Sequence, residues 1–271
     1  MTELENFYTH YQIDEFYQEQ DKWSKNPIQP FKKKVHKKLS HGVIPGYRNY
    51  DLFYERYLSA ALIFKQKNLL EDGMKVLDIG CGEGFFKIFI DKINQKDLSW
   101  YGIECWEERR KFCEHIGYSV EDTDLEQGKL PYQDNQFDVV LASHVIEHLP
   151  NPKEIVREMG RVTKKGGIIL IATPTKIPIV ATLDAKYHHL QNRHQGETQQ
   201  AFTYRSLEKM VLEALHLQPG NVIDKRGFRI LSGRKHLPIE NWKWFYKLSQ
   251  KTGKKMMYFV PEINLIVKNE K

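Results

Sequence analysis

The chain has 271 residues, of which 41% are hydrophobic and 28% are charged, and this composition excludes a wholly disordered protein. Its three cysteines, Cys81, Cys105 and Cys113, include no Cys-x-x-Cys pair. We therefore expect neither a disulfide framework nor a zinc knuckle, and we favour a reducing, cytoplasmic setting. No apolar run approaches the roughly 20 residues of a membrane span, and the polar N-terminus lacks a secretory apolar region. A formal net charge of +6 permits anionic partners without indicating a dedicated nucleic-acid binder.

The first seventy residues are rich in tyrosine and phenylalanine, and we expect residues 1–70 to form an N-terminal helical cap. Apolar residues recur at helical spacing over residues 50–70, which predicts a helix leading into the core. The basic run at residues 32–38 fits a solvated helix face, and it also fits attraction to phosphate groups. The sequence leaves its role open.

From residue 74 onward, short apolar runs alternate with helical patterns. Strands are expected at residues 75–79, 99–103, 137–142 and 168–172, with helices at 84–93, 107–115 and 152–162. This alternation is typical of βαβ units on a parallel sheet. A polar insertion at about residues 174–203 precedes a helix at 204–215 and a last strand at 262–268. We therefore predict one α/β core over residues 71–271.

A glycine-rich turn follows the first expected strand. Asp78 lies near the end of that strand, and Gly80, Gly82 and Gly84 follow it before the next helix. Glycines allow a tight turn and let a ligand approach the backbone, and such a turn at the carboxyl end of a strand is where a nucleotide-like ligand is expected. Dinucleotide folds use G-x-G-x-x-G, but Phe85 occupies the third glycine position here. The alternative interpretation is an ordinary strand–turn–helix corner.

The G-x-G-x-G turn with its preceding aspartate resembles motif I of the class I S-adenosylmethionine-dependent methyltransferases, and ordered segments over roughly residues 50–175 resemble later motifs of that family. The resemblance implies a Rossmann-like fold with a mostly parallel seven-stranded sheet, helices on both faces, and S-adenosylmethionine as cofactor. Glu104 would hold the ribose, because a carboxylate offers acceptors to both hydroxyls of a diol. Asp124 would accept from the adenine amino group. The expected cofactor-binding residues are Asp78, Gly80, Cys81, Gly82, Gly84, Glu104, Cys105, Asp124, Leu125 and Ser143.

Histidines are the candidate catalytic bases. His144 and His148 follow the fourth strand, and His194 lies in the insertion; any of them could take a proton from a hydroxyl acceptor. Each could instead only orient a loop, pack or bind substrate. The spacing His144-x-x-Glu147-His148 also resembles, imperfectly, the Glu-x-x-Glu-His metal layout of the small-RNA 2′-O-methyltransferases. We assign no metal ligand, because Glu-His-Leu is also widespread among small-molecule methyltransferases.

The sequence therefore predicts a methyltransferase that methylates a hydroxyl or amine of a small-molecule metabolite or natural product. A pocket enclosed by the cap and the insertion would favour a small acceptor, because a long nucleic acid needs an open basic groove. The alternatives are a metal-dependent RNA 2′-O-methyltransferase and a non-catalytic cofactor-binding subunit. The identity of the acceptor, the choice among O-, N- and C-methylation, and the oligomeric state stay undecided.

Overall fold

The computed structural model describes residues 49–176, 200–227, 248, 252 and 262–270. Most of the expected cap and most of the insertion, including His194, lie outside these residues. Within them, no helix has both the length and the apolar character needed to cross a membrane.

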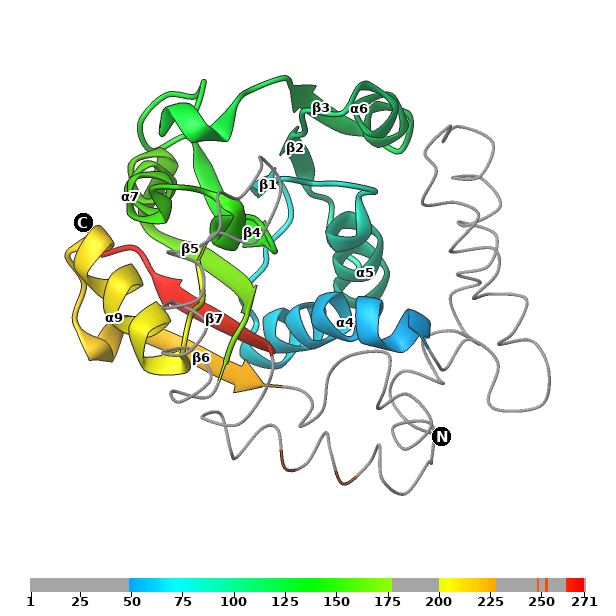
Figure 1. The fold of residues 1–271 in the computed structure, drawn as a ribbon. Helices are drawn as coiled ribbons and strands as arrows, with labels where there is room; N and C mark the ends of the chain where they lie inside the picture. The colour runs from blue at the N-terminus through cyan, green and yellow to red at the C-terminus, as the bar shows by residue number, and fades with distance from the viewer. Residues whose placement is uncertain (1–48, 177–199, 228–247, 249–251, 253–261, 271) are drawn as a thin grey trace.

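A seven-stranded sheet with the order β3-β2-β1-β4-β5-β7-β6 forms the centre of the molecule (Figure 1). Strands β1 to β5 pair in parallel, whereas β7 runs antiparallel to both β5 and β6. This arrangement confirms the predicted mostly parallel sheet. The strands are β1 (Lys75–Ile79), β2 (Ser99–Ile103), β3 (Tyr118–Glu121), β4 (Phe137–Ser143), β5 (Thr163–Pro174), β6 (Val222–Gly227) and β7 (Glu262–Lys268).

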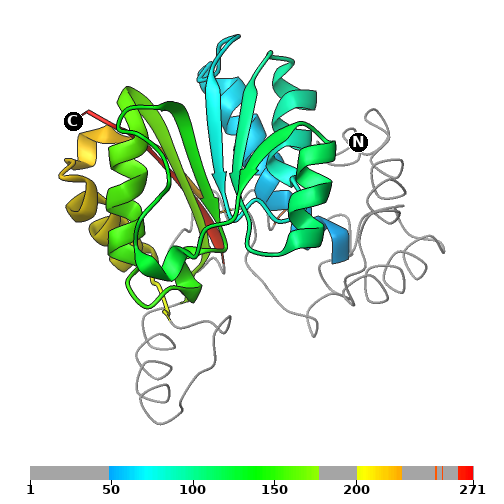
Figure 2. The same cartoon turned by 90° about the horizontal axis from the view of Figure 1, so that it is seen from above.

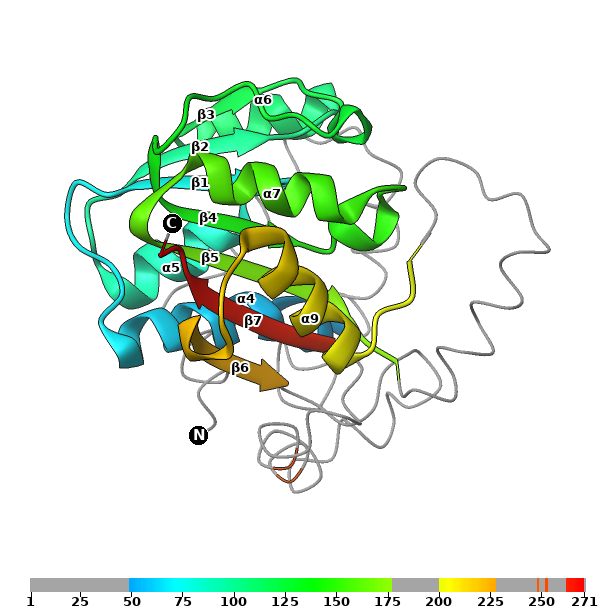
Figure 3. The same ribbon diagram turned by 90° about the vertical axis from the view of Figure 1, so that its left-hand side faces the viewer.

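Helices cover both faces of the sheet (Figures 2 and 3). Helices α4 (Asn49–Lys67), α5 (Phe85–Asn94) and α6 (Glu107–His115) lie on one face, and α7 (Pro152–Val162) and α9 (Tyr204–Leu215) lie on the other. The central strands are buried on both sides, and they therefore have nearly continuous apolar sequences. Two apolar clusters result, one beneath each helical layer.

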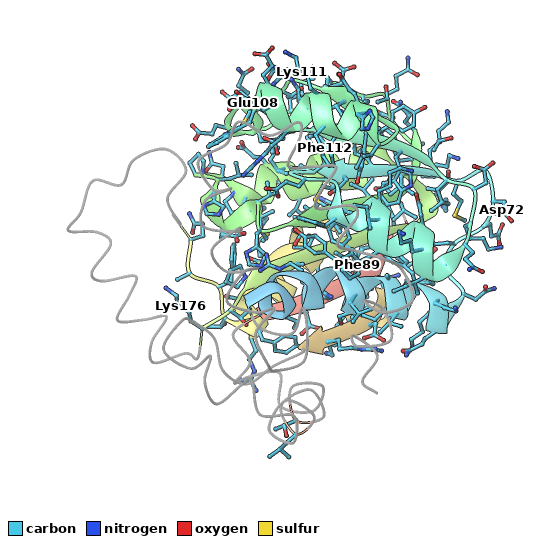
Figure 4. The ribbon with its side chains drawn as sticks, turned by 90° about the vertical axis from the view of Figure 1, so that its right-hand side faces the viewer. Asp72, Phe89, Glu108, Lys111, Phe112 and Lys176 are labelled. Carbon is cyan, nitrogen blue, oxygen red and sulfur yellow. The ribbon has the colours of Figure 1, made fainter. Side chains whose placement is uncertain are left out.

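Helix α4 belongs to the core layer of its face. The rings of Tyr57 and Phe86 meet edge to face at 4.9 Å, and the Asn264 side chain on β7 donates to the Arg56 carbonyl at 3.1 Å. Figure 4 views this face, on which α6 carries the exposed Glu108. Residues 1–48 lie outside the described part, so the expected cap boundary at residue 70 stays a prediction.

The structure contains two strands that the sequence did not predict, and one predicted strand begins earlier than expected. The sequence did not predict β3 and β6, because each is a short edge strand whose polar residues hide the apolar alternation. Strand β5 begins at Thr163 rather than at residue 168. Its pairing with β4 shifts register between Phe137 and Val139, and this irregularity accommodates the polar residues 164–167 before the apolar run.

Candidate cofactor and catalytic site

The glycine turn connects β1 to α5 at the carboxyl end of the sheet. Gly80, Gly82 and Gly84 have φ angles of +67°, +55° and +68°, which glycine adopts without steric cost. A Cβ on Gly80 would lie 2.5 Å from Cγ2 of Val145, and one on Gly84 would lie 2.5 Å from Cδ1 of Ile116. Among the residues that the structure describes, the nearest atom to a Cβ on Gly82 would be the Gly80 carbonyl oxygen at 3.9 Å. A side chain at Gly80 or Gly84 would therefore have to displace a neighbouring side chain, whereas Gly82 faces space that a ligand can enter.

Glu104 follows β2 and lies beside this turn. Its carboxylate is 6% exposed, and its Oε2 accepts from the Gly82 backbone N–H at 3.0 Å while its Oε1 accepts from the Trp106 N–H at 3.0 Å. The Arg109 guanidinium, stacked on the Trp106 ring at 4.8 Å, lies 4.0 Å from Oε2. A carboxylate has about four lone-pair sites, so this anchored group keeps acceptor capacity for a ligand diol.

Asp78 lies beneath the turn and is buried from solvent. The residue is 2% exposed, and one carboxylate oxygen accepts from the Tyr118 hydroxyl at 3.1 Å. Burial raises the pKa of Asp78 to about 8, the charge of Glu104 adds to the rise, and the Tyr118 hydrogen bond opposes it. A cation or a donor from a bound ligand would favour the ionised form.

The remaining expected cofactor residues surround the same edge of the sheet. Asp124 is exposed, and its side chain caps the 3₁₀ turn η1 (Leu125–Gln127) by accepting from the Glu126 N–H at 3.0 Å. Ser143 ends β4, and its buried hydroxyl oxygen has no hydrogen-bond partner among the described residues. An orphaned hydroxyl at a strand end is consistent with a ligand contact.

His144 lies between two buried carboxylates immediately after β4. Its Nε2 is 2.5 Å from Oε1 of Glu262, and its Nδ1 is 3.3 Å from Oε1 of Glu147. Its backbone is left-handed, with φ +55°, which is uncommon for a residue other than glycine. Nε2 is engaged by Glu262, whereas Nδ1 lies near Oε1 of Glu147, a buried oxygen without a hydrogen-bond partner among the described residues. With a carboxylate beside each ring nitrogen, His144 is poorly placed to accept a proton from a hydroxyl.

The carboxylates around His144 have further partners. The Nε of Arg56 is 2.9 Å from Oε1 of Glu262, and the Thr173 hydroxyl donates to Oε2 of Glu147 at 3.0 Å. An arginine and an imidazolium would balance the charges of two carboxylates, and buried charges require such pairing. We name Arg56, His144, Glu147 and Glu262 the buried quartet.

His148 borders the buried quartet in the turn η2 (Ile146–His148). Its Nε2 lies 3.8 Å from Oε1 of Glu147, so His144 and His148 meet at one carboxylate oxygen. Its buried Nδ1 has no hydrogen-bond partner among the described residues. No group of three or more histidine, cysteine or acidic side chains is arranged to hold a metal in that part of the chain, and His194 lies outside it.

The sequence did not identify Arg56 and Glu262 as site residues. Glu262 is the first residue of the expected last strand, and only the insertion of β7 beside β5 brings it to His144. A carboxylate at the start of a mainly apolar strand was the available signal, but its partner could not be read from spacing.

The strand order and the glycine turn facing an acidic residue after β2 define the class I S-adenosylmethionine-dependent methyltransferase fold. The family described as Methyltransferase domain matches residues 50–214. The chain belongs to this family. S-adenosylmethionine is the cofactor that fold and family imply, and the open space at Gly82 beside the anchored Glu104 carboxylate fits it.

Proteins of similar sequence support this family assignment. The chain is 29% identical over 125 residues to the ubiquinone biosynthesis O-methyltransferase of Leptothrix cholodnii, covering 43% of this chain and 52% of that protein. It is 29% identical over 170 residues to the demethylmenaquinone methyltransferase of Staphylococcus aureus, covering 57% and 68%. The chain thus spans about half the length of the first of these relatives.

A solved structure from Galdieria sulphuraria, described as a sarcosine dimethylglycine methyltransferase, superposes with a TM-score of 0.53 at 13% identity, covering 81% of this chain and 86% of that one. At this identity the similarity concerns the fold alone.

Proposed function

We propose that the chain is an S-adenosylmethionine-dependent methyltransferase that methylates a hydroxyl or amine of a small-molecule metabolite, with a quinone-like ring as the favoured acceptor. The observation that carries the proposal is the Gly82–Glu104 pair: an open glycine whose N–H anchors a buried carboxylate at 3.0 Å. The names of the two relatives, both of which refer to quinones, support the acceptor class. The three free cysteines of the chain support a reducing, cytoplasmic setting.

The cofactor would be held by the turn and the strand ends. Glu104 accepts from the ribose hydroxyls, and Asp124 accepts from the adenine amino group. Asp78 and Ser143 lie toward the remaining, methionine part of the cofactor. When bound, S-adenosylmethionine supplies an electrophilic methyl group. The main task of the chain is then to hold the acceptor in line with it, because positioning contributes much of the catalysis of such a displacement.

His148 is the base that we favour for a hydroxyl acceptor. Both nitrogens of His144 face carboxylates, whereas Nδ1 of His148 has no partner among the described residues. His148 would take the acceptor proton while Glu147, 3.8 Å from Nε2, stabilises the resulting imidazolium. His144 would then be a positioning residue that holds Glu147 in place.

Calorimetry with S-adenosylhomocysteine tests the cofactor assignment. The wild-type chain should bind it, and Glu104→Ala should weaken binding at least about 100-fold, because it removes charge-assisted hydrogen bonds to two hydroxyls. Arg110→Ala is a matched control, since Arg110 donates to the Glu104 backbone carbonyl at 3.1 Å rather than to its carboxylate. Preference for a nicotinamide cofactor would refute the assignment.

Mass spectrometry of methyl transfer to a panel of catechols, hydroquinones and amines tests the reaction. Product that depends on S-adenosylmethionine should form with at least one aromatic hydroxyl acceptor. Tight binding of the cofactor without any product across the panel would favour the non-catalytic subunit.

A further inference from the structure

Two buried thiols lie directly under the cofactor turn. Cys81 belongs to the turn and is 6% exposed, and Cys113 belongs to α6 and is 0% exposed. The Cys81 thiol donates to the Cys113 sulfur, and the two sulfur atoms are 3.6 Å apart. Both cysteines are free, and neither is needed as a nucleophile by the proposed methyl transfer.

Neighbouring glycines make room for these sulfur atoms. A Cβ on Gly102 would lie 2.8 Å from Sγ of Cys81, and a Cβ on Gly84 would lie 3.6 Å from Sγ of Cys113. The thiols are therefore packed against each other between β2 and the start of α5. A disulfide requires an S–S distance of about 2.05 Å, so the sulfur atoms would need to approach by only about 1.5 Å.

The thiol pair is connected to the residues proposed to bind the cofactor. The Cys113 thiol donates to the Gly82 carbonyl oxygen at 3.4 Å, and the N–H of the same Gly82 donates to Glu104 at 3.0 Å. Bond formation would remove the Cys113 donor and pull Cys81, the neighbour of Gly82, toward α6. The Gly82–Glu104 hydrogen bond would then be strained or lost.

We propose that Cys81 and Cys113 form a redox modification site, at which a hydroperoxide joins them in a disulfide that weakens cofactor binding. The more exposed Cys81 thiol attacks the peroxide, which breaks the O–O bond and gives a sulfenic acid and an alcohol or water. The Cys113 thiol then attacks the sulfenic sulfur and expels water. Two thiols lose two electrons, and the hydroperoxide takes them up.

The reaction should be slow at neutral pH and suppressed by ligand. The Cys113 hydrogen bond and burial raise the pKa of the Cys81 thiol, and the thiolate is the reactive form. Oxidation should therefore accelerate from pH 7 to pH 9. Bound cofactor over Gly82 should protect the pair, because it covers the turn and resists its displacement.

The test uses the full chain and hydrogen peroxide. After treatment, non-reducing peptide mapping should show a Cys81–Cys113 link, and the dissociation constant for S-adenosylhomocysteine should rise at least about tenfold. Dithiothreitol should restore affinity, which separates the disulfide from irreversible oxidation. Cys113→Ser should bind with peroxide-insensitive affinity, and Cys113→Ala serves if the serine variant does not fold by circular dichroism.

The inference depends on the proposed cofactor role of Gly82 and Glu104, and the outcomes separate the two ideas. If the reduced wild-type chain does not bind S-adenosylhomocysteine, the cofactor assignment fails. If the reduced chain binds it but peroxide yields no Cys81–Cys113 link, or yields the link with unchanged affinity, only the redox site is overturned.

Discussion

The imidazole Nε2 of His144 lies 2.5 Å from Oε1 of Glu262, although the two residues are 118 positions apart in the chain. The contact joins the loop after β4 to the start of β7. Arg56 of α4 approaches the same carboxylate oxygen at 2.9 Å. One buried carboxylate thus connects three segments at the edge of the sheet where the methyl acceptor is proposed to bind.

Replacing Glu262 should therefore destabilise the chain strongly. Glu262→Gln leaves the Arg56 guanidinium, and any charge on His144, facing a neutral amide in a buried site. Breaking a buried pair costs about 3–5 kcal/mol in the free energy of unfolding. Urea denaturation at pH 7 measures this loss.

Glu213→Gln is the control for that measurement. Glu213 pairs with Lys153 at 3.0 Å, but the two side chains are 48% and 41% exposed, and such surface pairs contribute about 0–1 kcal/mol. If both variants lose the same small amount, the Glu262 contacts do not stabilise the fold.

The sequence predicted the parts of the fold that depend on local periodicity. The expected bounds of α6 and α9 agree with the structure. In α9, the buried residues Leu207, Val211 and Ala214 form an apolar stripe at helical spacing, which specifies the helix. The cofactor turn was equally local, since three glycines within five residues follow a buried strand. The contact of Glu262 with His144 depends on which strand lies beside β5, and spacing along one chain carries no such information.

Asp78 should make the stability of the ligand-free chain depend on pH. Its folded pKa of about 8 lies above the ordinary value of 3.8, so the folded state binds more protons than the unfolded state between these two values. The free energy of unfolding should therefore fall as pH rises from about 4 to about 8. Asp78→Asn should flatten this slope, as measured by urea denaturation across that range. A slope equal to that of the wild type would contradict the raised pKa.

Binding of the cofactor should release a proton from Asp78. At pH 7 the carboxyl is largely protonated, because burial raises its pKa to about 8. S-adenosylhomocysteine has no sulfonium charge, but its α-ammonium group near Asp78 would favour the carboxylate, so the proton leaves on binding. Calorimetry of S-adenosylhomocysteine binding in phosphate and in Tris should give different enthalpies for the wild type and a smaller difference for Asp78→Asn. Equal differences in the two proteins would assign the proton elsewhere.

His148 and His144 should differ in their effect on the rate. If His148 takes the acceptor proton, His148→Gln should lower kcat about 10²–10⁴-fold and remove the fall in rate at acidic pH. His144→Gln should lower the rate less and keep that pH dependence, because His144 acts through Glu147. Cofactor affinity measured in parallel separates catalysis from binding. Unchanged rates in both variants would leave neither histidine as the base.

The last prediction isolates the space in front of Gly82. Gly82→Ala and Gly73→Ala both place a Cβ on a left-handed residue, with φ +55° and +82°, so each should lose about 1–2 kcal/mol of folding stability. Neither Cβ would clash with the described part of the chain, in which nothing lies within 4 Å at Gly73 and the nearest atom at Gly82 is 3.9 Å away. Only the Cβ at Gly82 would occupy the space assigned to the cofactor. Glycine in such turns lets a ligand approach the backbone closely, so Gly82→Ala should weaken S-adenosylhomocysteine binding at least about tenfold. Gly73→Ala should bind the ligand as the wild type does. Equal affinities in the two variants would mean that the ligand does not approach the turn at Gly82.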